Sequence, residues 1–280
     1  MKNILLLTDF SDSAWNAAVY ALHFFKKTKC NFFLFHVCTP STFAEFDAPY
    51  LLSRENLEIL YLKPAKQKLK QVVKQLVKEV PQNPNHKIYT LTEYGPFVET
   101  VKKQLDEKRI TGIVMGTKGA SRLEASIMGS NTGNVITKVK CTTLIVPLEA
   151  TVKPIKEIAF PTDFILSYEI KTLNPILELL EETKAFLSIL HILGKNKKLT
   201  LNQQSNKELL EDFFSACKQN TYFLTNKQVE EAVQCFIESR NIDMVVMVAK
   251  NLSYFQQIVF HTKVEKVSYH THIPFLVLHE

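Results

Sequence analysis

The feature that most constrains this chain is that its two halves have similar sequences. An apolar run ends in Thr-Asp-Phe at Thr8–Phe10 and does so again at Thr162–Phe164, 154 residues later. The segments that begin at Val114 and Val246 align without a gap at an offset of 132, so the second half is 22 residues shorter in its middle. Self-similarity on this scale indicates a tandem duplication. It predicts two domains, residues 1–150 and 151–280, each long enough to bury its own core.

Within each half, short apolar runs alternate with amphipathic segments. Near-continuous apolar strands separated by helices are typical of a parallel sheet covered on both faces, so each half is predicted to be an α/β domain. In the first half the predicted strands are Ile4–Leu7, Asn31–Val37, Lys87–Glu93, Gly112–Gly116 and Thr142–Pro147, and the helices are Ser13–Lys27, Arg54–Val80, a segment from Pro96 to Glu107, and Asn131–Lys138. In the second half the strands are Glu157–Phe160, Ala185–Ile192, Thr221–Thr225, Met244–Val248 and Phe275–Leu278, and the helices are Tyr168–Lys184, Ser205–Gln219, Asn226–Arg240 and a segment Lys263–His270.

Composition narrows the class of protein. A hydrophobic content of 46% and a charged content of 22% are typical of a globular chain. The net charge of +6 comes partly from the lysine-rich segment Lys63–Val80, where lysines alternate with apolar residues, and this pattern favours a solvated helix face over a nucleic-acid surface. No apolar run approaches the roughly 20 residues of a membrane span, and Asp9 interrupts the start too early for a secretory signal. We therefore expect a cytoplasmic protein without membrane or nucleic-acid partners. Five cysteines without C-x-x-C spacing argue against disulfides and zinc.

Glycines are concentrated in one stretch. Gly116, Gly119 and Gly129 are three of only 7 in the chain. Gly116 ends a predicted strand, and ligands of open parallel sheets bind at the carboxyl ends of strands. Ser130 and Asn131 are suitable N-caps for the helix that follows, and the exposed amides of a helix N-terminus attract anions. The stretch predicts a phosphate site.

The spacing Gly-x-x-Gly, nine residues, then Gly-Ser resembles the nucleotide-binding signature of the universal stress protein family. The segments "LLLTDFSDSAWNAAVYAL", "LFHV", "YGPFVETV" and "CTTLIVP" resemble other parts of that family. The resemblance implies two tandem open-sheet domains, Rossmann-like and similar to adenine nucleotide alpha hydrolases, which pair through their last strands as an intramolecular pseudo-dimer. It also implies a role in stress response or signalling and the binding of ATP or AMP, with or without Mg²⁺.

The resemblance also assigns site residues in the first half. It implies that Asp9 contacts the adenine or ribose and that the backbone at Val37 borders the adenine. Met115 and Gly116 would lie along the nucleoside. We add two nearby cations that could screen phosphate charge. The remaining residues that this interpretation places at the ribose and phosphates are Gly119, Gly129, Ser130 and Asn131, with Lys118 and Arg122 as the added cations.

The second half has lost the glycines. The alignment places Val248, Asn251 and His261 where the first half has its three motif glycines. A β-branched side chain at the first of these positions blocks close approach of the backbone to a ligand. We therefore expect the second half not to bind nucleotide and to act as a structural partner. The spacing His270-x-His272 lacks a supporting carboxylate or cysteine cluster, so no metal site is predicted.

Other interpretations stay open. The glycines could shape only a turn, and Asp9 could cap the following helix, in which case the chain would be a scaffold without a ligand. A slow ATPase or an autophosphorylating enzyme is a further alternative. Against it, the chain has neither a Walker motif nor a Gly-rich pyrophosphatase loop after its first strand. His36 is the one plausible general base, but a histidine buried in a strand is more often structural, and no catalytic residue is therefore assigned. The insertion Cys38–Leu57 could be a lid or a surface excursion, and the protein partner and any further homodimer stay unidentified.

Overall fold

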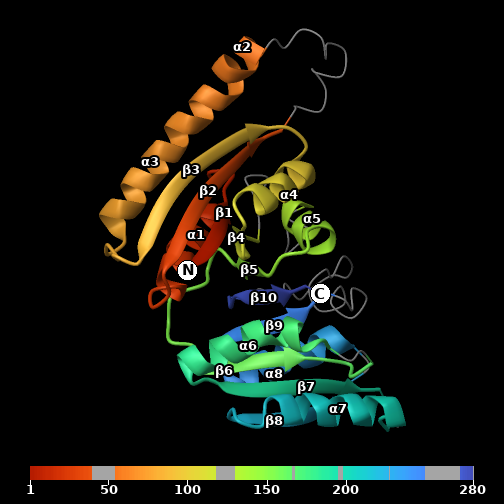
Figure 1. The fold of residues 1–280 in the computed structure, drawn as a ribbon. Coiled ribbons are helices and arrows are strands. Elements are labelled where there is room, and N and C mark those ends of the chain that lie inside the picture. Colours follow the sequence, from red (N-terminus) through yellow and green to blue (C-terminus); the bar gives the residue numbers. More distant parts are fainter. Residues whose placement is uncertain are drawn as a thin grey trace. The chain divides into compact units, whose positions relative to one another are not determined.

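The computed structural model describes residues 1–39, 54–117, 130–165, 168–194, 198–226, 228–249 and 272–279 (Figure 1). These residues fall into two compact units, an N-terminal unit up to Leu148 and a C-terminal unit from Glu149 onwards. Both units are open, parallel α/β sheets, so the predicted fold class is confirmed. The predicted segment Lys263–His270 and residues 40–53 of the predicted insertion lie outside the described residues.

The N-terminal unit has five parallel strands in the order β3-β2-β1-β4-β5. Its strands are β1 (Lys2–Leu7), β2 (Cys30–Cys38), β3 (His86–Tyr94), β4 (Gly112–Gly116) and β5 (Thr143–Val146). Its helices are α1 (Asp12–Phe24), α2 (Arg54–Leu57), the π-helix η1 (Glu58–Leu62), α3 (Lys63–Glu79), α4 (Phe97–Glu107) and α5 (Ser130–Lys138). Because the chain moves from β1 outwards to β3 and then returns to β4, the strand order reverses between β1 and β4.

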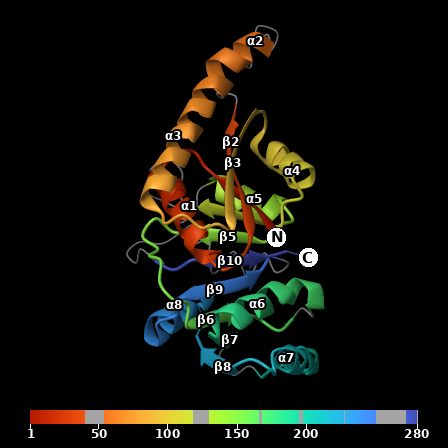
Figure 2. The ribbon, with the colours of Figure 1, turned by 60° about the vertical axis from the view of Figure 1, so that its left-hand side comes forward.

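Two layers of helices bury this sheet. In Figure 2, α1 and α3 lie on one face, and α4 and α5 lie on the other. Between the sheet and the second layer lies a cluster that includes Leu5, Phe35, Val101, Ile113 and Val135, each at most 1% exposed. Apolar residues at alternate positions of β1, β2 and β4 enter this cluster, while the intervening ones face the other layer of helices. Burial on both faces explains why the central strands β1 and β4 are continuously apolar, whereas the edge strand β3 is more polar and half-exposed.

Local sequence signals determine where helices begin and where their hydrogen-bond spacing changes. Ser11 is the N-cap of α1, and its Oγ accepts a hydrogen bond from the Ala14 amide at 3.3 Å. The predicted helix Arg54–Val80 is interrupted by η1, where the Lys63 amide donates to the Glu58 carbonyl, five residues back. Pro64 follows at once and has no N–H with which to continue an α-helical ladder. The proline therefore accounts for the change of register.

The C-terminal unit has the same strand order, β8-β7-β6-β9-β10. Its strands are β6 (Glu157–Pro161), β7 (Phe186–Leu193), β8 (Gln219–Thr225), β9 (Met244–Val248) and β10 (Phe275–Leu278). Its helices are α6 (Ile170–Thr183), α7 (Leu201–Phe213) and α8 (Val229–Arg240). The prediction for α7, Ser205–Gln219, was wrong at both ends. The helix begins earlier because Thr200 and Gln203 form a capping box, in which each side chain accepts a hydrogen bond from the backbone amide of the other residue.

A buried carboxylate fastens the chain at the start of β6. Asp243 is 8% exposed, and its Oδ2 accepts hydrogen bonds from the amides of Lys156 at 2.8 Å and Glu157 at 3.1 Å. Lys153 Nζ lies 2.7 Å from its Oδ1. Burial acts to raise the pKa of Asp243, but the hydrogen bonds from Lys153 and the two amides outweigh it, and the pKa lies below its ordinary value.

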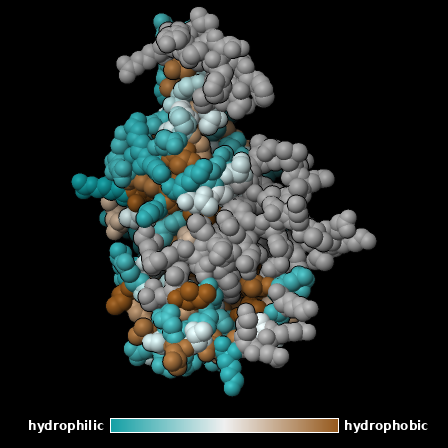
Figure 3. All heavy atoms as spheres, turned by 90° about the vertical axis from the view of Figure 1, so that its right-hand side faces the viewer, coloured by the Kyte–Doolittle hydropathy of each residue, from teal (hydrophilic) through white to brown (hydrophobic). Residues whose placement is uncertain are grey.

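The described surface is mixed in character. In the face drawn in Figure 3, hydrophilic side chains are interspersed with small apolar patches. Single exposed apolar residues are ordinary in folded proteins. No helix among the described residues is both long and apolar enough to cross a bilayer.

The Asp243 contacts predict a pH-dependent contribution to stability. Asp243→Asn should lower the free energy of unfolding at pH 7 by about 1–3 kcal/mol, because it removes a charged acceptor from two amides and an ammonium. Since the folded-state pKa is lowered, this contribution is full above the unfolded value of about 3.9 and is lost as the pH falls through the folded value. Urea unfolding from pH 7 down to pH 3 measures it. The exposed Asp212→Asn is the matched control, and an equal loss in both variants would contradict the assignment.

Candidate functional site

The structure brings together four of the predicted site residues at one edge of the N-terminal sheet. β1 pairs with β2 on one side and with β4 on the other, so the carboxyl ends of these three strands are neighbours. Asp9 follows β1, Val37 lies near the end of β2, and Met115 and Gly116 end β4. Val37 and Met115 are 8% and 5% exposed and belong to the buried cluster under α4 and α5. Only their backbones can therefore border a ligand.

The loop after β1 is held by its own side chains. The Thr8 hydroxyl accepts from the Phe10 amide at 3.0 Å, and Asp9 Oδ1 accepts from the Ser11 amide at 3.1 Å and from the Ser11 hydroxyl at 2.5 Å. Phe10 has a φ of 67°, in the left-handed region that non-glycine residues seldom adopt. Asp9 therefore does not cap α1, which is the role of Ser11, but holds the Ser11 amide and hydroxyl and so fixes the loop on which any ligand would rest.

An aromatic and cationic cluster lies beside this loop. The ring centres of Phe10 and His36 are 4.4 Å apart, and Lys68 Nζ lies 5.5 Å from the centre of the Phe10 ring. His36 Nδ1 is 2.8 Å from the Thr8 carbonyl oxygen, which can only accept, so Nδ1 carries the proton. Burial lowers the pKa of His36, and nearby Lys68 lowers it further, against the opposing effects of the Thr8 carbonyl and Asp9. The imidazole is therefore neutral near pH 7.

Gly116 is explained first by packing. A Cβ at this position would lie 2.2 Å from Ser13 Oγ, 2.8 Å from the Ser13 carbonyl oxygen and 2.9 Å from its carbonyl carbon. Only a residue without a side chain lets α1 approach β4 this closely. Ser13 is buried, and its hydroxyl has no hydrogen-bond partner among the residues that the structure describes. The sequence interpretation assigned Gly116 to ligand contact and missed Ser13.

The start of α5 is tied to the end of β4. Thr132 Oγ1 donates to the Gly116 carbonyl at 3.0 Å and lies 3.4 Å from the Thr117 carbonyl oxygen. Ser130 is the first residue of α5 that the structure describes. Ser130 and Asn131 are exposed, and their amides belong to the first helical turn, whose N–H groups lack intrahelical partners. This arrangement can bind an anion.

Several predicted site residues lie outside the described residues. In the N-terminal unit these are Lys118, Gly119, Arg122 and Gly129, and in the C-terminal unit Asn251, His261 and His270. Of the alignment positions in the second half, Val248 is described, and it is buried at the end of β9.

The C-terminal unit repeats the loop but closes it with aromatic rings. Phe164 again has a positive φ, 56°, and its amide donates to the Thr162 hydroxyl at 3.2 Å. His191 Nδ1 is 2.8 Å from the Thr162 carbonyl oxygen, as His36 is from Thr8 in the first unit. Phe164 is 1% exposed, and its ring lies 4.9 Å from the His191 ring and 6.5 Å from the Phe223 ring.

Helix α7 covers this second loop. Gln203 Nε2 donates to the Asp163 carbonyl at 2.8 Å, and Asn206 Nδ2 donates to the Phe164 carbonyl at 2.9 Å. The corresponding helix of the first unit, α3, instead places Lys68 over the Phe10 ring, and Phe10 is only partly buried. The two units therefore carry the same loop beneath different helix side chains, with its phenylalanine partly buried in the first unit and buried in the second.

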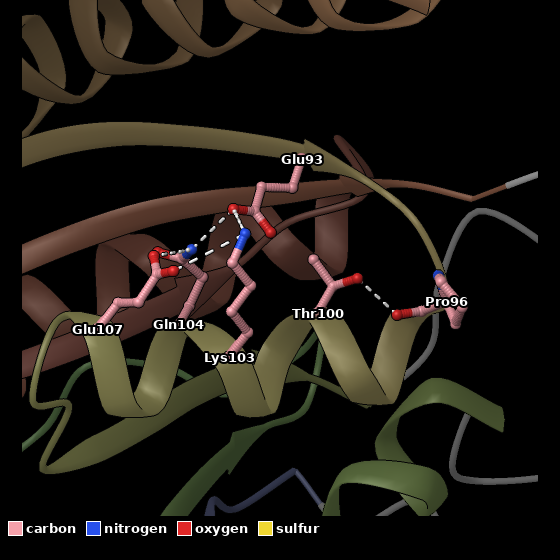
Figure 4. Close-up of polar contacts among 6 residues, drawn as sticks. All are labelled: Glu93, Pro96, Thr100, Lys103, Gln104 and Glu107. Carbon is pink, nitrogen blue, oxygen red and sulfur yellow. Dashed lines mark hydrogen bonds and ion pairs between the residues drawn. The ribbon is translucent and has the colours of Figure 1, made fainter. Parts of the chain in front are cut away.

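A polar cluster elsewhere in the N-terminal unit is structural. Glu93 of β3 accepts from Lys103 at 2.8 Å and from Gln104 at 3.0 Å, and Gln104 also donates to Glu107 at 3.1 Å (Figure 4). The hydrogen bond to Glu93 is the main reason why the pKa of Lys103 is raised. These contacts attach α4 to β3. Within the described ranges, no group of three or more His, Cys, Asp or Glu side chains could hold a metal ion.

Comparison with known proteins agrees with this architecture. The model of the universal stress protein family matches residues 1–147. A universal stress protein from Archaeoglobus fulgidus is 15% identical, covers 98% of this chain and 95% of that chain, and has a TM-score of 0.70. A functionally unknown protein from Pseudomonas aeruginosa is 11% identical, covers 100% of this chain and 92% of that chain, and has a TM-score of 0.56. These two structures share the fold across both units.

A third solved structure is a universal stress protein in complex with cAMP. It is 20% identical, covers 52% of this chain and 96% of that chain, and has a TM-score of 0.39. No curated protein matches the sequence.

The contact of Gly116 with α1 predicts a stability effect. Gly116→Ala should lower the free energy of unfolding by about 1–3 kcal/mol, because α1 must move to admit a methyl group. Ser13→Ala in the same chain should not restore stability, since the clash with the Ser13 backbone remains. Gly112→Ala at the other end of β4 is the control, because its Cβ would meet the flexible end of Ile4 at 3.3 Å and the Thr142 carbonyl oxygen at an ordinary contact distance of 3.7 Å. Urea unfolding followed by circular dichroism measures all three. Full rescue by Ser13→Ala would show that the hydroxyl alone makes the contact.

Proposed function

The chain belongs to the universal stress protein family, and from that premise we propose that its N-terminal unit binds one adenine nucleotide, ATP or AMP, in a stress-response or signalling role. The observation that carries the proposal is the convergence of Asp9, Gly116 and the N-terminus of α5 at the point where the strand order reverses. Ligands of open α/β sheets bind at such points. A cytoplasmic location is part of the same proposal.

The residues present suit a nucleotide. The first-turn amides of α5 at Ser130 and Asn131 supply donors for phosphate oxygens, and the positive end of the helix dipole adds to the attraction. A carboxylate such as Asp9 accepts from a ribose hydroxyl or an amino group. The backbones of Val37 and Met115 would line the nucleoside. The motif residues Lys118, Gly119, Arg122 and Gly129 are proposed to complete the phosphate side.

We propose that the C-terminal unit does not bind nucleotide. Val248 stands at the position of Gly116, and α7 binds the carbonyls of the loop that corresponds to Asp9 and Phe10. Its proposed role is that of structural partner in an intramolecular pseudo-dimer, on which an unidentified protein partner could act.

An enzymatic function is the second candidate. Within the described part of the site, His36 is neutral and donates from Nδ1 to the Thr8 carbonyl, which leaves the Nε2 lone pair for a general base; the same contact at His191 in the other unit favours a structural role instead. Phosphate release above background, abolished by Gly119→Val, would favour the slow ATPase.

The duplicated loop supplies a matched test of nucleotide binding. Asp9→Ala should weaken ATP or AMP binding by roughly 10- to 100-fold, the effect of losing one hydrogen bond to a charged group. Asp163→Ala removes the equivalent bond to the Ile165 amide in the other unit and should leave binding unchanged. Calorimetric titration gives both affinities and should give one site per chain.

Mass spectrometry of freshly purified protein provides an independent readout. We expect ATP or AMP to be retained by the wild type and lost in Gly129→His, which introduces the residue found at the aligned position of the second half. Absence of both retained nucleotide and binding heat would refute the proposal and favour a scaffold protein without a ligand. Two sites per chain would refute a silent C-terminal unit.

A further inference from the structure

Helix α3 carries a concentration of positive charge that the nucleotide site does not use. Its 17 residues include six lysines and one glutamate. One of these lysines, Lys66, is paired with Glu58 at 2.6 Å, and another, Lys68, lies over the Phe10 ring. The other four lysines are exposed and make no ion pair or side-chain hydrogen bond with a residue that the structure describes. They are Lys63, Lys70, Lys74 and Lys78.

These four lysines form one row. At 3.6 residues per turn, they fall within about 80° of one another around the helix axis and extend over about 22 Å along it. The opposite side of α3 is buried through Ala65, Leu69 and Leu76. Gln67 and Gln71 are exposed beside the row. We call the four lysines and two glutamines the α3 lysine face. No described carboxylate interrupts it.

The fold does not require this charge. In the C-terminal unit, α7 connects the second and third strands as α3 does in the first, and it has one lysine against three acidic residues. The same asymmetry extends to the whole chain. Residues 1–148 contain 20 Lys and Arg against 12 Asp and Glu, whereas residues 149–280 contain 14 against 16. A helix in this position can therefore fold with an acidic surface, so folding does not select the lysines of α3.

We propose that the α3 lysine face binds the phosphate backbone of double-stranded nucleic acid without reading its sequence. A single file of ammonium groups matches a line of phosphates, and exposed glutamine amides can donate to phosphate and sugar oxygens. The face has neither arginine nor aromatic residues with which to read or stack on bases. A membrane surface is a poorer fit, because the apolar side of α3 is buried and Val77 is the one exposed apolar residue of the helix. This inference replaces the solvated helix face favoured by the sequence and does not depend on nucleotide binding.

Fluorescence anisotropy with a labelled duplex of about 20 base pairs tests the proposal on the full chain. Four phosphate contacts predict a slope of log affinity against log salt of about −3 to −4, which is a loss of about 100-fold between 50 and 200 mM salt. Changing all four lysines to glutamine should remove binding at 50 mM salt. The matched control changes Lys138, Lys140, Lys198 and Lys218 to glutamine, which are exposed lysines elsewhere with the same total charge. The control should lose less than about threefold.

Two outcomes would overturn the inference. One is the absence of binding by the wild type at 50 mM salt. The other is an equal loss in the control, which would mean that net charge alone attracts the duplex. Vesicles with and without about 30% phosphatidylserine are tested in parallel, and binding to the anionic vesicles without binding to the duplex would assign the face to a membrane surface instead. Circular dichroism of both variants establishes that a loss of binding is not a loss of fold.

Discussion

The close approach of α1 to β4 at Gly116 is the contact on which both the N-terminal fold and its site depend. Ser13 occupies the space that a side chain at position 116 would need. The Gly116 carbonyl in turn accepts from Thr132 and so positions the start of α5. One glycine therefore fixes the distance between the loop after β1 and the helix N-terminus after β4. A ligand that contacts both elements experiences a geometry set by core packing.

Comparison of the two units shows which features are common to the fold and which differ between them. Both units hold a phenylalanine in the left-handed region, bond its amide to the threonine two residues before it, and place a histidine Nδ1 against that threonine's carbonyl. Since the covered loop in the C-terminal unit keeps all of these contacts, they serve the stability of the loop. The units differ in which described side chains contact the loop: Lys68 lies over a partly buried Phe10, whereas Gln203 and Asn206 donate to the carbonyls of Asp163 and Phe164. The helix side chains that contact the loop, rather than its conformation, therefore distinguish the two units.

Much of the architecture could be predicted because it depends on local periodicity. The strands Gly112–Gly116, Met244–Val248 and Phe275–Leu278 have the predicted bounds, since buried parallel strands are continuously apolar. The predictions failed at helix starts and breaks that one or two side chains set, and they missed a contact between residues far apart in the sequence. Pro64 could have signalled the break in the long helix, and Thr200 with Gln203 the earlier start of α7. No local pattern marks the contact of Ser13 with Gly116, because it joins residues that are far apart in sequence.

The two halves also show why charge is a separate kind of information from fold. Packing determines which side of α3 or α7 is buried, and Leu69 and Leu210 serve that purpose equally well. Packing places little constraint on the outward side, where lysine and glutamate have similar helix propensities. Because the two copies share strand order and loop geometry, the difference in their outward charge is not a by-product of the architecture. The proposed nucleotide site at the carboxyl edge of the sheet and the α3 lysine face proposed to bind nucleic acid therefore use different residues of the N-terminal unit.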